Sequence, residues 1–89
     1  MIKLQRATHL RDQTIRLEFS DGTSGDYDAA PLIRREGAMV QPLRDPAFFK
    51  CFFIEEGALA WPNGFDLGPD GLHRRLAEQG LLQRPRAAE

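Results

Sequence analysis

The sequence predicts an α+β fold, with antiparallel β-hairpin and meander units in one sheet, a carboxy-terminal helix packed on that sheet, and short helical turns between them. Three observations indicate this class. Apolar and polar residues alternate through 15–20, the period of a strand with one buried face. Two apolar runs, 51–54 and 58–61, flank a Glu-Glu-Gly turn. Leucines then recur at helical spacing within 69–79.

The first half of the chain predicts a three-stranded meander. A first strand over about 2–10 turns through the polar residues 11–13 and pairs with the alternating strand 15–20. Asp21-Gly22 is typical of a two-residue hairpin turn. The returning strand, 23–27, is weakly apolar and interrupted by glycine, which favours an edge position.

Two acids that precede prolines predict short helical turns in the middle of the chain. Asp28 can cap a helix whose first turn tolerates Pro31, and Asp45 can cap one that begins at Pro46. Residues 51–54 then form a strand that pairs with 58–61.

The chain is long enough for one domain, which we place at residues 1–82. The last helix begins near Pro69 and stops at Gly80, and residues 83–89 predict a disordered tail with nothing to bury. The large apolar side chains of the strands and of the last helix predict the core. These residues are Ile15, Leu17, Phe19, Trp61, Leu72 and Leu76.

The composition favours a cytoplasmic protein. A net charge of −1 creates no field that attracts nucleic acid or a membrane. The amino terminus lacks the apolar run of a secretory signal, and no segment approaches the roughly 20 apolar residues that span a bilayer. The single Cys51 excludes an internal disulfide, and its neighbours Phe49, Phe52 and Phe53 predict a buried, reduced and unreactive thiol.

Several short motifs together resemble the small bacterial domain of unknown function 2442 family, over about residues 3–76. They are Phe19-Ser20-Asp21-Gly22, Tyr27-Asp28 before Pro31-Leu32, Pro42-Leu43-Arg44-Asp45, Trp61-Pro62-Asn63-Gly64, Asp66-Leu67 and Pro69-Asp70. The resemblance implies a compact α+β domain like the amino-terminal domain of a solved member. Some relatives carry an appended helix-turn-helix, for which too few residues follow the last helix here, and others resemble one half of two-gene modules of toxin–antitoxin type. The resemblance supplies no catalytic residues.

No combination of residues predicts a catalytic or metal site, and we expect no cofactor. Asp28, Asp66 and Asp70 lie beside predicted helix starts, where acids satisfy free backbone N–H groups. His9 and His73 each stand alone in their segments, without Cys or His at ligand spacing. A surface ion pair between His73 and Asp70, one helical turn apart, accounts for that histidine.

Two arginine pairs, Arg34-Arg35 and Arg74-Arg75, form a candidate basic patch if folding brings them to one face. Nucleic-acid binders gather an excess of positive charge, whereas glutamates offset these arginines throughout the chain. We therefore expect solvated helix faces and no nucleic-acid partner.

A run of large apolar residues predicts an interaction surface, because consecutive apolar residues in a strand point to both faces of a sheet. The predicted helices are short, so a second molecule would cover the remaining face, most simply in a twofold homodimer. The candidate surface comprises Phe48, Phe49, Phe52, Phe53 and Ile54.

The sequence favours a non-enzymatic protein-interaction module, with a second copy or a small protein as its partner, in a toxin–antitoxin-like or regulatory pair. Two alternatives stay open. One is a nucleic-acid-binding domain that uses the arginine pairs, and the other is a small hydrolase built around Asp66, Asp70 and His73.

Overall fold

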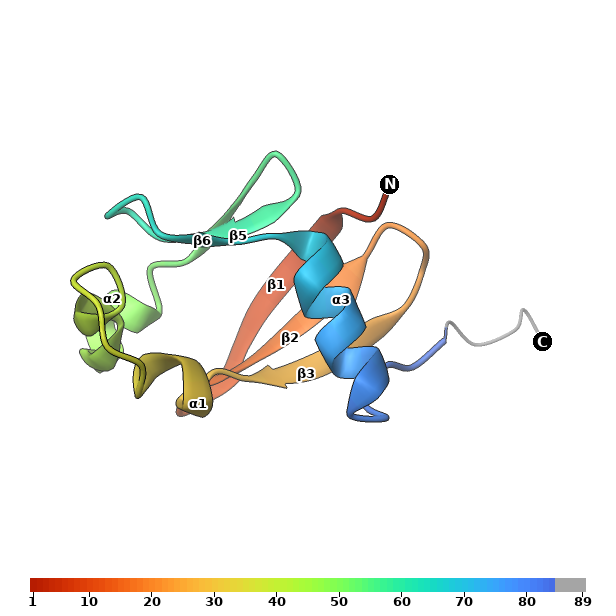
Figure 1. The fold of residues 1–89 in the computed structure, drawn as a ribbon. Helices are drawn as coiled ribbons and strands as arrows, with labels where there is room; N and C mark the ends of the chain where they lie inside the picture. Colours follow the sequence, from red (N-terminus) through yellow and green to blue (C-terminus); the bar gives the residue numbers. More distant parts are fainter. Residues whose placement is uncertain (85–89) are drawn as a thin grey trace.

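A computed structural model describes residues 1–84 of the chain (Figure 1). It confirms the α+β class, with antiparallel strands, short helices and a longer carboxy-terminal helix. The elements in chain order are β1 (Leu4–Arg11), β2 (Thr14–Phe19), β3 (Ser24–Asp28), α1 (Ala30–Ile33), the 3₁₀ helix η1 (Gln41–Arg44), α2 (Pro46–Phe49), β4 (Phe53–Glu55), β5 (Ala58–Ala60), β6 (Asp66–Leu67) and α3 (Pro69–Glu78).

The first sheet is the predicted meander, with strand order β1-β2-β3. Its alternation has the expected effect, because Ile15, Leu17 and Phe19 are all at most 1% exposed. The opposite face is polar and carries the cross-strand ion pair of Arg16 with Asp26, whose atoms Nε and Oδ1 are 3.1 Å apart. One face of this sheet is therefore core and the other is solvated.

Gly25 allows the end of the chain to lie against β3. A Cβ atom at this position would stand 3.0 Å from the carbonyl oxygen of Leu81 and 3.1 Å from Cδ1 of Leu76. The glycine that weakens β3 as a strand is thus the residue that admits the segment after α3.

Part of the predicted tail belongs to this contact. Gln83, which we expected at the start of a tail over 83–89, exchanges two backbone hydrogen bonds with Ser24, at 2.7 and 2.9 Å. The bridge covers one end of the β3 edge. Residues 85–89 of that tail lie outside the described residues.

The second hairpin forms a sheet of its own, so the prediction of a single sheet is wrong. Its strand order is β4-β5-β6, and β6 pairs Leu67 with Leu59. One backbone hydrogen bond joins the two sheets, from the N–H of Leu4 to the carbonyl of Gly57 at 2.9 Å. The register of β1 against β2 shifts just after Leu4, which breaks the regular edge that a continuous sheet would need.

The strand predicted at 51–54 begins later than expected. Cys51 lies in the turn that ends α2, where its N–H donates to the carbonyl of Phe48 at 2.9 Å. Cys51 is exposed, so the prediction of a buried thiol is wrong. Cys51 is still part of the turn, Phe52 follows it outside any element, and β4 starts at Phe53.

The helix ends follow the predicted chemistry in most places. The Asp45 carboxylate caps α2 by accepting a hydrogen bond from the N–H of Ala47 at 3.2 Å. Asp28 lies one residue too early to be the N-cap of α1, and accepts instead from the N–H of Ala30 at 2.9 Å. Gly80, with φ of 72°, closes α3, and the next N–H reaches back to the carbonyl of Leu76.

Trp61 stands at the centre of the core. It is 1% exposed, and its indole Nε1 donates to the carbonyl of Phe49 at 2.8 Å. Its ring lies 5.9 Å from the rings of both Phe49 and Phe65, so it joins α2 to the turn after β5. All six residues predicted as core are at most 4% exposed.

No helix within residues 1–84 has the length and apolar content to cross a bilayer.

Candidate functional site

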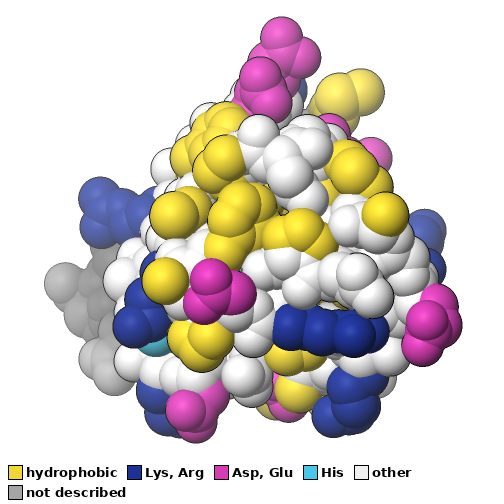
Figure 2. Space-filling view, turned by 90° about the vertical axis from the view of Figure 1, so that its left-hand side faces the viewer, with side chains coloured by type: hydrophobic (Ala, Val, Ile, Leu, Met, Phe, Trp, Pro, Cys, Tyr) yellow, Lys and Arg dark blue, Asp and Glu magenta, His cyan; other side chains and the backbone are white. Residues whose placement is uncertain are grey.

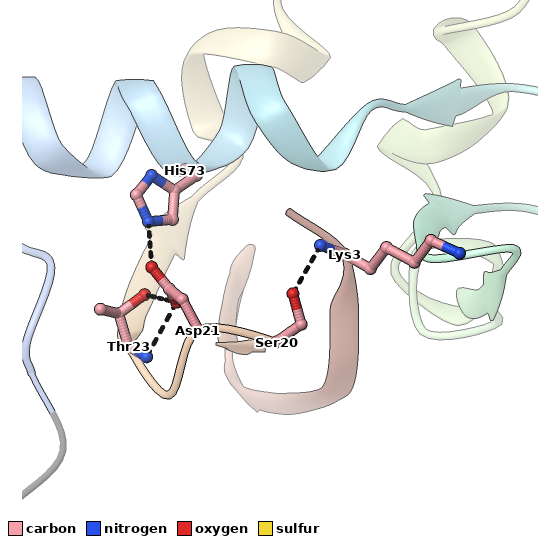
Figure 3. A network of polar contacts seen from close by, with 5 residues as sticks. All are labelled: Lys3, Ser20, Asp21, Thr23 and His73. Carbon is pink, nitrogen blue, oxygen red and sulfur yellow. Dashed lines mark hydrogen bonds and ion pairs between the residues drawn. The ribbon is translucent and has the colours of Figure 1, made fainter. Parts of the chain in front are cut away.

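The most connected polar cluster ties the β2–β3 turn to α3 (Figure 3). The Asp21 carboxylate accepts three hydrogen bonds, from the Thr23 N–H at 3.0 Å, the Thr23 hydroxyl at 2.6 Å and Nε2 of His73 at 3.0 Å. Since an ionised carboxylate only accepts, Nε2 carries the hydrogen in this contact. The His73 ring also packs edge-on against Phe19, with centroids 5.0 Å apart.

A pocket of about 280 Å³ opens beside this cluster, between the β2–β3 turn and the end of α3. Its polar lining includes Asp21, Thr23 and His73. The Thr23 hydroxyl is directed to Asp21 and not to the imidazole, so the histidine has no hydroxyl nucleophile as its partner in this cluster. The arrangement therefore serves to fix the hairpin turn against the helix.

The bonds to Asp21 predict a specific dependence of stability on pH. The Thr23 hydroxyl, above all, lowers the pKa of Asp21 from its ordinary value of 3.8, and His73 contributes further. A lowered pKa in the folded state means that the stabilisation is complete above 3.8 and is lost as the pH falls through the folded value. We expect Asp21→Ala to reduce the free energy of unfolding at neutral pH by about 1–2 kcal/mol, and the deficit to shrink towards about pH 2.

Urea unfolding of the two proteins at both pH values measures this difference. Glu55→Ala, which removes an exposed acid of β4, is the control and should match the parent protein at both. A deficit for Asp21→Ala that is equal at neutral and acid pH would contradict the role of the carboxylate charge.

The predicted ion pair between His73 and Asp70 is wrong, because His73 bonds Asp21, which is 52 residues away in sequence. Asp70 lies in the first turn of α3, and Asp66 lies in β6. The structure thus commits the only histidine of the hydrolase hypothesis to a different acid. Within residues 1–84, no three His, Cys, Asp or Glu side chains are grouped as a metal site would need.

The structure divides the predicted apolar surface between core and exterior. Phe49 is 2% exposed and belongs to the core, so its assignment to an exposed surface is wrong. Phe48, Phe52 and Ile54 are partly buried against the core, whereas Phe53 is 43% exposed. Within α2, Phe49 is the buried residue, and in β4 Phe53 is exposed while Ile54 is partly buried.

The arginine pairs are also divided. Arg35, just after α1, and Arg75, in α3, line one pocket of about 190 Å³, whereas Arg34 and Arg74 do not line it. The predicted patch of four arginines is therefore a site of two. All four arginines are exposed, but only one residue of each pair lines the pocket.

Sequence reasoning missed three residues that organise these sites. The sequence indicated Asp21 only as part of a turn, and Tyr27 only as the end of a strand and part of a family motif. Arg44 holds the end of α1, because its Nε donates to the carbonyl of Ile33 at 2.7 Å and its Nη2 to that of Arg35 at 2.9 Å. An Asp followed two residues later by Thr is a usable signal for the turn. The long-range contacts have no local signal.

Comparison with known proteins identifies one match. A family model described as a protein of unknown function (DUF2442) matches residues 4–78. The match covers nearly the range over which the motifs of the sequence indicated the resemblance. No curated protein and no solved structure matches the chain.

Proposed function

Because the chain belongs to the DUF2442 family, whose description assigns no activity, we propose from its surface that it is a non-enzymatic protein-interaction module. In this proposal it acts in the cytoplasm as one partner of a small toxin–antitoxin-like or regulatory pair, and it associates with a second copy of itself. The lone exposed thiol of Cys51 suits a reducing compartment.

The exposure of Phe53 is the observation that carries the proposal. Phe53 pairs with Ala60 across β4 and β5, whereas the next pair, Ile54 with Leu59, faces the core. Because neighbouring positions of a strand face opposite sides, Phe53 lies on the outward side of the second sheet. That sheet runs along the top of the molecule in Figure 1, with the helices below or beside it.

Further apolar side chains continue from Phe53 around this end of the molecule. The ring centroids of Phe52 and Phe65 lie 6.3 and 5.9 Å from that of Trp61. Met39 is 45% exposed, and its carbonyl accepts a hydrogen bond from the Asn63 side chain at 3.0 Å. We name Met39, Phe48, Phe52, Phe53 and Phe65 the apolar end.

Figure 2 looks onto this end and shows hydrophobic side chains grouped in its upper half, with charged side chains around the edges and in the lower part. Grouped apolar side chains on a small soluble domain are typical of protein-protein contact surfaces. A patch that pairs with itself about a twofold axis needs no second kind of partner, so a homodimer is the simplest assembly.

Phe53→Ser tests the proposal by light scattering across a wide range of protein concentration. We expect the parent protein to pass from the mass of one chain towards that of two, and the variant to stay at one. Leu81→Ser is the matched control, because Leu81 is 45% exposed but lies after α3, at the other end of the molecule. It should associate like the parent protein.

Cys51 provides a second measurement on the same surface, since its thiol is exposed two residues before Phe53. Association should slow its reaction with a thiol reagent as the concentration rises, in the parent protein and not in Phe53→Ser. A parent protein that stays at the mass of one chain, with a labelling rate independent of concentration, would refute the dimer.

A further inference from the structure

A second site of a different kind lies between α1 and α3. It is the pocket of about 190 Å³ that Arg35 and Arg75 line, and residues of β3, β6 and α3 complete it. In Figure 1, α1 follows the end of β3 and α3 crosses in front of that strand. The pocket does not include the residues of the apolar end, so the proposed dimer makes no use of it.

Two arginines, both exposed residues, line this pocket, and none of its lining residues is acidic. The ion pairs found within residues 1–84 join Arg6 with Glu18, Arg16 with Asp26, and His73 with Asp21. Neither Arg35 nor Arg75 takes part in them. Guanidinium groups that converge on a pocket offer several N–H donors in a fork geometry suited to oxyanions.

The Tyr27 hydroxyl is a third donor. Tyr27 is 5% exposed as a residue and lines the pocket; its hydroxyl is not among buried polar atoms left without a partner within residues 1–84, so it is open to solvent in the pocket. Burial raises the pKa of Tyr27, and the charges of Arg75 and Arg35 oppose that rise. The phenol therefore keeps its proton at neutral pH and can donate. The charge of Asp28 also raises the pKa of Tyr27, and the exposed Asp28 carboxylate accepts a hydrogen bond from the N–H of Ala30.

The backbone around the pocket is held in place and left open. The Arg44 side chain binds the carbonyls of Ile33 and Arg35, which fixes the segment that carries Arg35. On the other side, α3 starts without a side-chain cap, after Gly68. Cβ atoms added at Gly68 or Gly71 would meet nothing within 4 Å, so the first turn of α3 stays accessible.

We propose that this pocket binds the phosphate group of a small phosphomonoester. A phosphate monoester carries about −1.5 to −2 charges near neutral pH and three strong acceptor oxygens. Two arginines and one phenol match that charge and that number of acceptors. A carboxylate, with one charge and two oxygens, would leave some of these donors unused.

The test is a titration followed by the NMR signals of backbone amides and arginine Nε–H groups. Inorganic phosphate, glycerol phosphate and acetate are added separately at constant ionic strength. We expect saturable shifts at Gly71, Arg35 and Arg75 with both phosphates, and none with acetate at the same concentrations. Tighter binding of glycerol phosphate than of inorganic phosphate would identify an ester as the ligand, and the reverse order would identify free phosphate.

The neighbouring arginines are matched controls, because each lies on the same segment and outside the pocket. We expect Arg35→Gln and Arg75→Gln to weaken phosphate binding at least tenfold, and Arg34→Gln and Arg74→Gln to change it less than twofold. Tyr27→Phe keeps the buried ring and should weaken binding by about two- to tenfold, the effect of one hydrogen bond.

Equal weakening by all four arginine variants would overturn the site, since it would show a general attraction of anions to positive charge. Equal shifts with acetate and phosphate, or no saturation with either phosphate, would also overturn it. Circular dichroism spectra of each variant establish that the fold is intact. The oligomeric state does not enter these measurements, so they succeed or fail independently of the proposed dimer.

Discussion

Trp61→Ala should leave the domain largely unfolded at room temperature. The substitution removes the ring that contacts Phe49, Phe52 and Phe65, and it removes the donor to the Phe49 carbonyl. Replacing a buried aromatic residue by alanine costs roughly 3–5 kcal/mol, and the stranded carbonyl adds about 1–3 kcal/mol. A domain of this size has a total stability of roughly 5–10 kcal/mol, so little would remain.

Far-UV circular dichroism during thermal unfolding measures the effect, since the variant has no tryptophan whose fluorescence could be followed. Trp61→Phe is the control, because it retains an aromatic ring and loses the Nε1 donor. We expect it to fold with an intermediate midpoint. A midpoint for Trp61→Ala close to that of the parent protein would show that the ring contributes little to the core.

The elements that could be predicted from the sequence are those with a local chemical cause. Alternation at Ile15, Leu17 and Phe19 predicted β2 and its buried face, and Asp45-Pro46 predicted the start of α2. Gly80 predicted the end of α3, and its positive φ supplies the reason. In each case the residues that determine a strand or a helix end lie in that element or within a few positions of it.

Two of the misses depend on contacts between distant segments. β6 has two residues, Asp66 and Leu67, which is too short for any alternation to be visible, and only its pairing with β5 defines it. The partner of His73 is the acid of a turn 52 residues earlier, whereas the sequence offered Asp70 nearby. Nearness in sequence did not identify the partner of His73, because His73 lies on the face of α3 that packs against Phe19 of the first sheet.

The proposed phosphate pocket shows the same limit. The arginine pairs were visible in the sequence as pairs, but only Arg35 and Arg75 line the pocket, and Arg34 and Arg74 do not. Tyr27 contributes a hydroxyl that no sequence pattern distinguishes from a core ring. One residue of each pair lines the pocket, and only the folded chain shows which one it is.

Phe49→Ala is expected to destabilise the fold strongly and to leave the apolar end in place. Phe49 is 2% exposed, and its ring contacts those of Trp61 and Phe52, with centroids 5.9 and 6.4 Å apart. We expect a loss of roughly 3–5 kcal/mol in the free energy of unfolding. Phe53→Ala, at a side chain that is 43% exposed, should cost less than about 1 kcal/mol.

Urea unfolding of the two variants, each at a concentration where the parent protein has the mass of one chain, separates the two roles. If Phe49 were a surface residue, as the sequence alone indicated, its variant would unfold like the parent protein and only self-association would suffer. The structure predicts the opposite assignment, with the stability defect at Phe49 and the association defect at Phe53. Because β4 starts two residues after the turn at Cys51, a shift of the chain by one position would exchange inward and outward aromatic residues. The pair of variants therefore tests the register of this segment as well as the location of the surface.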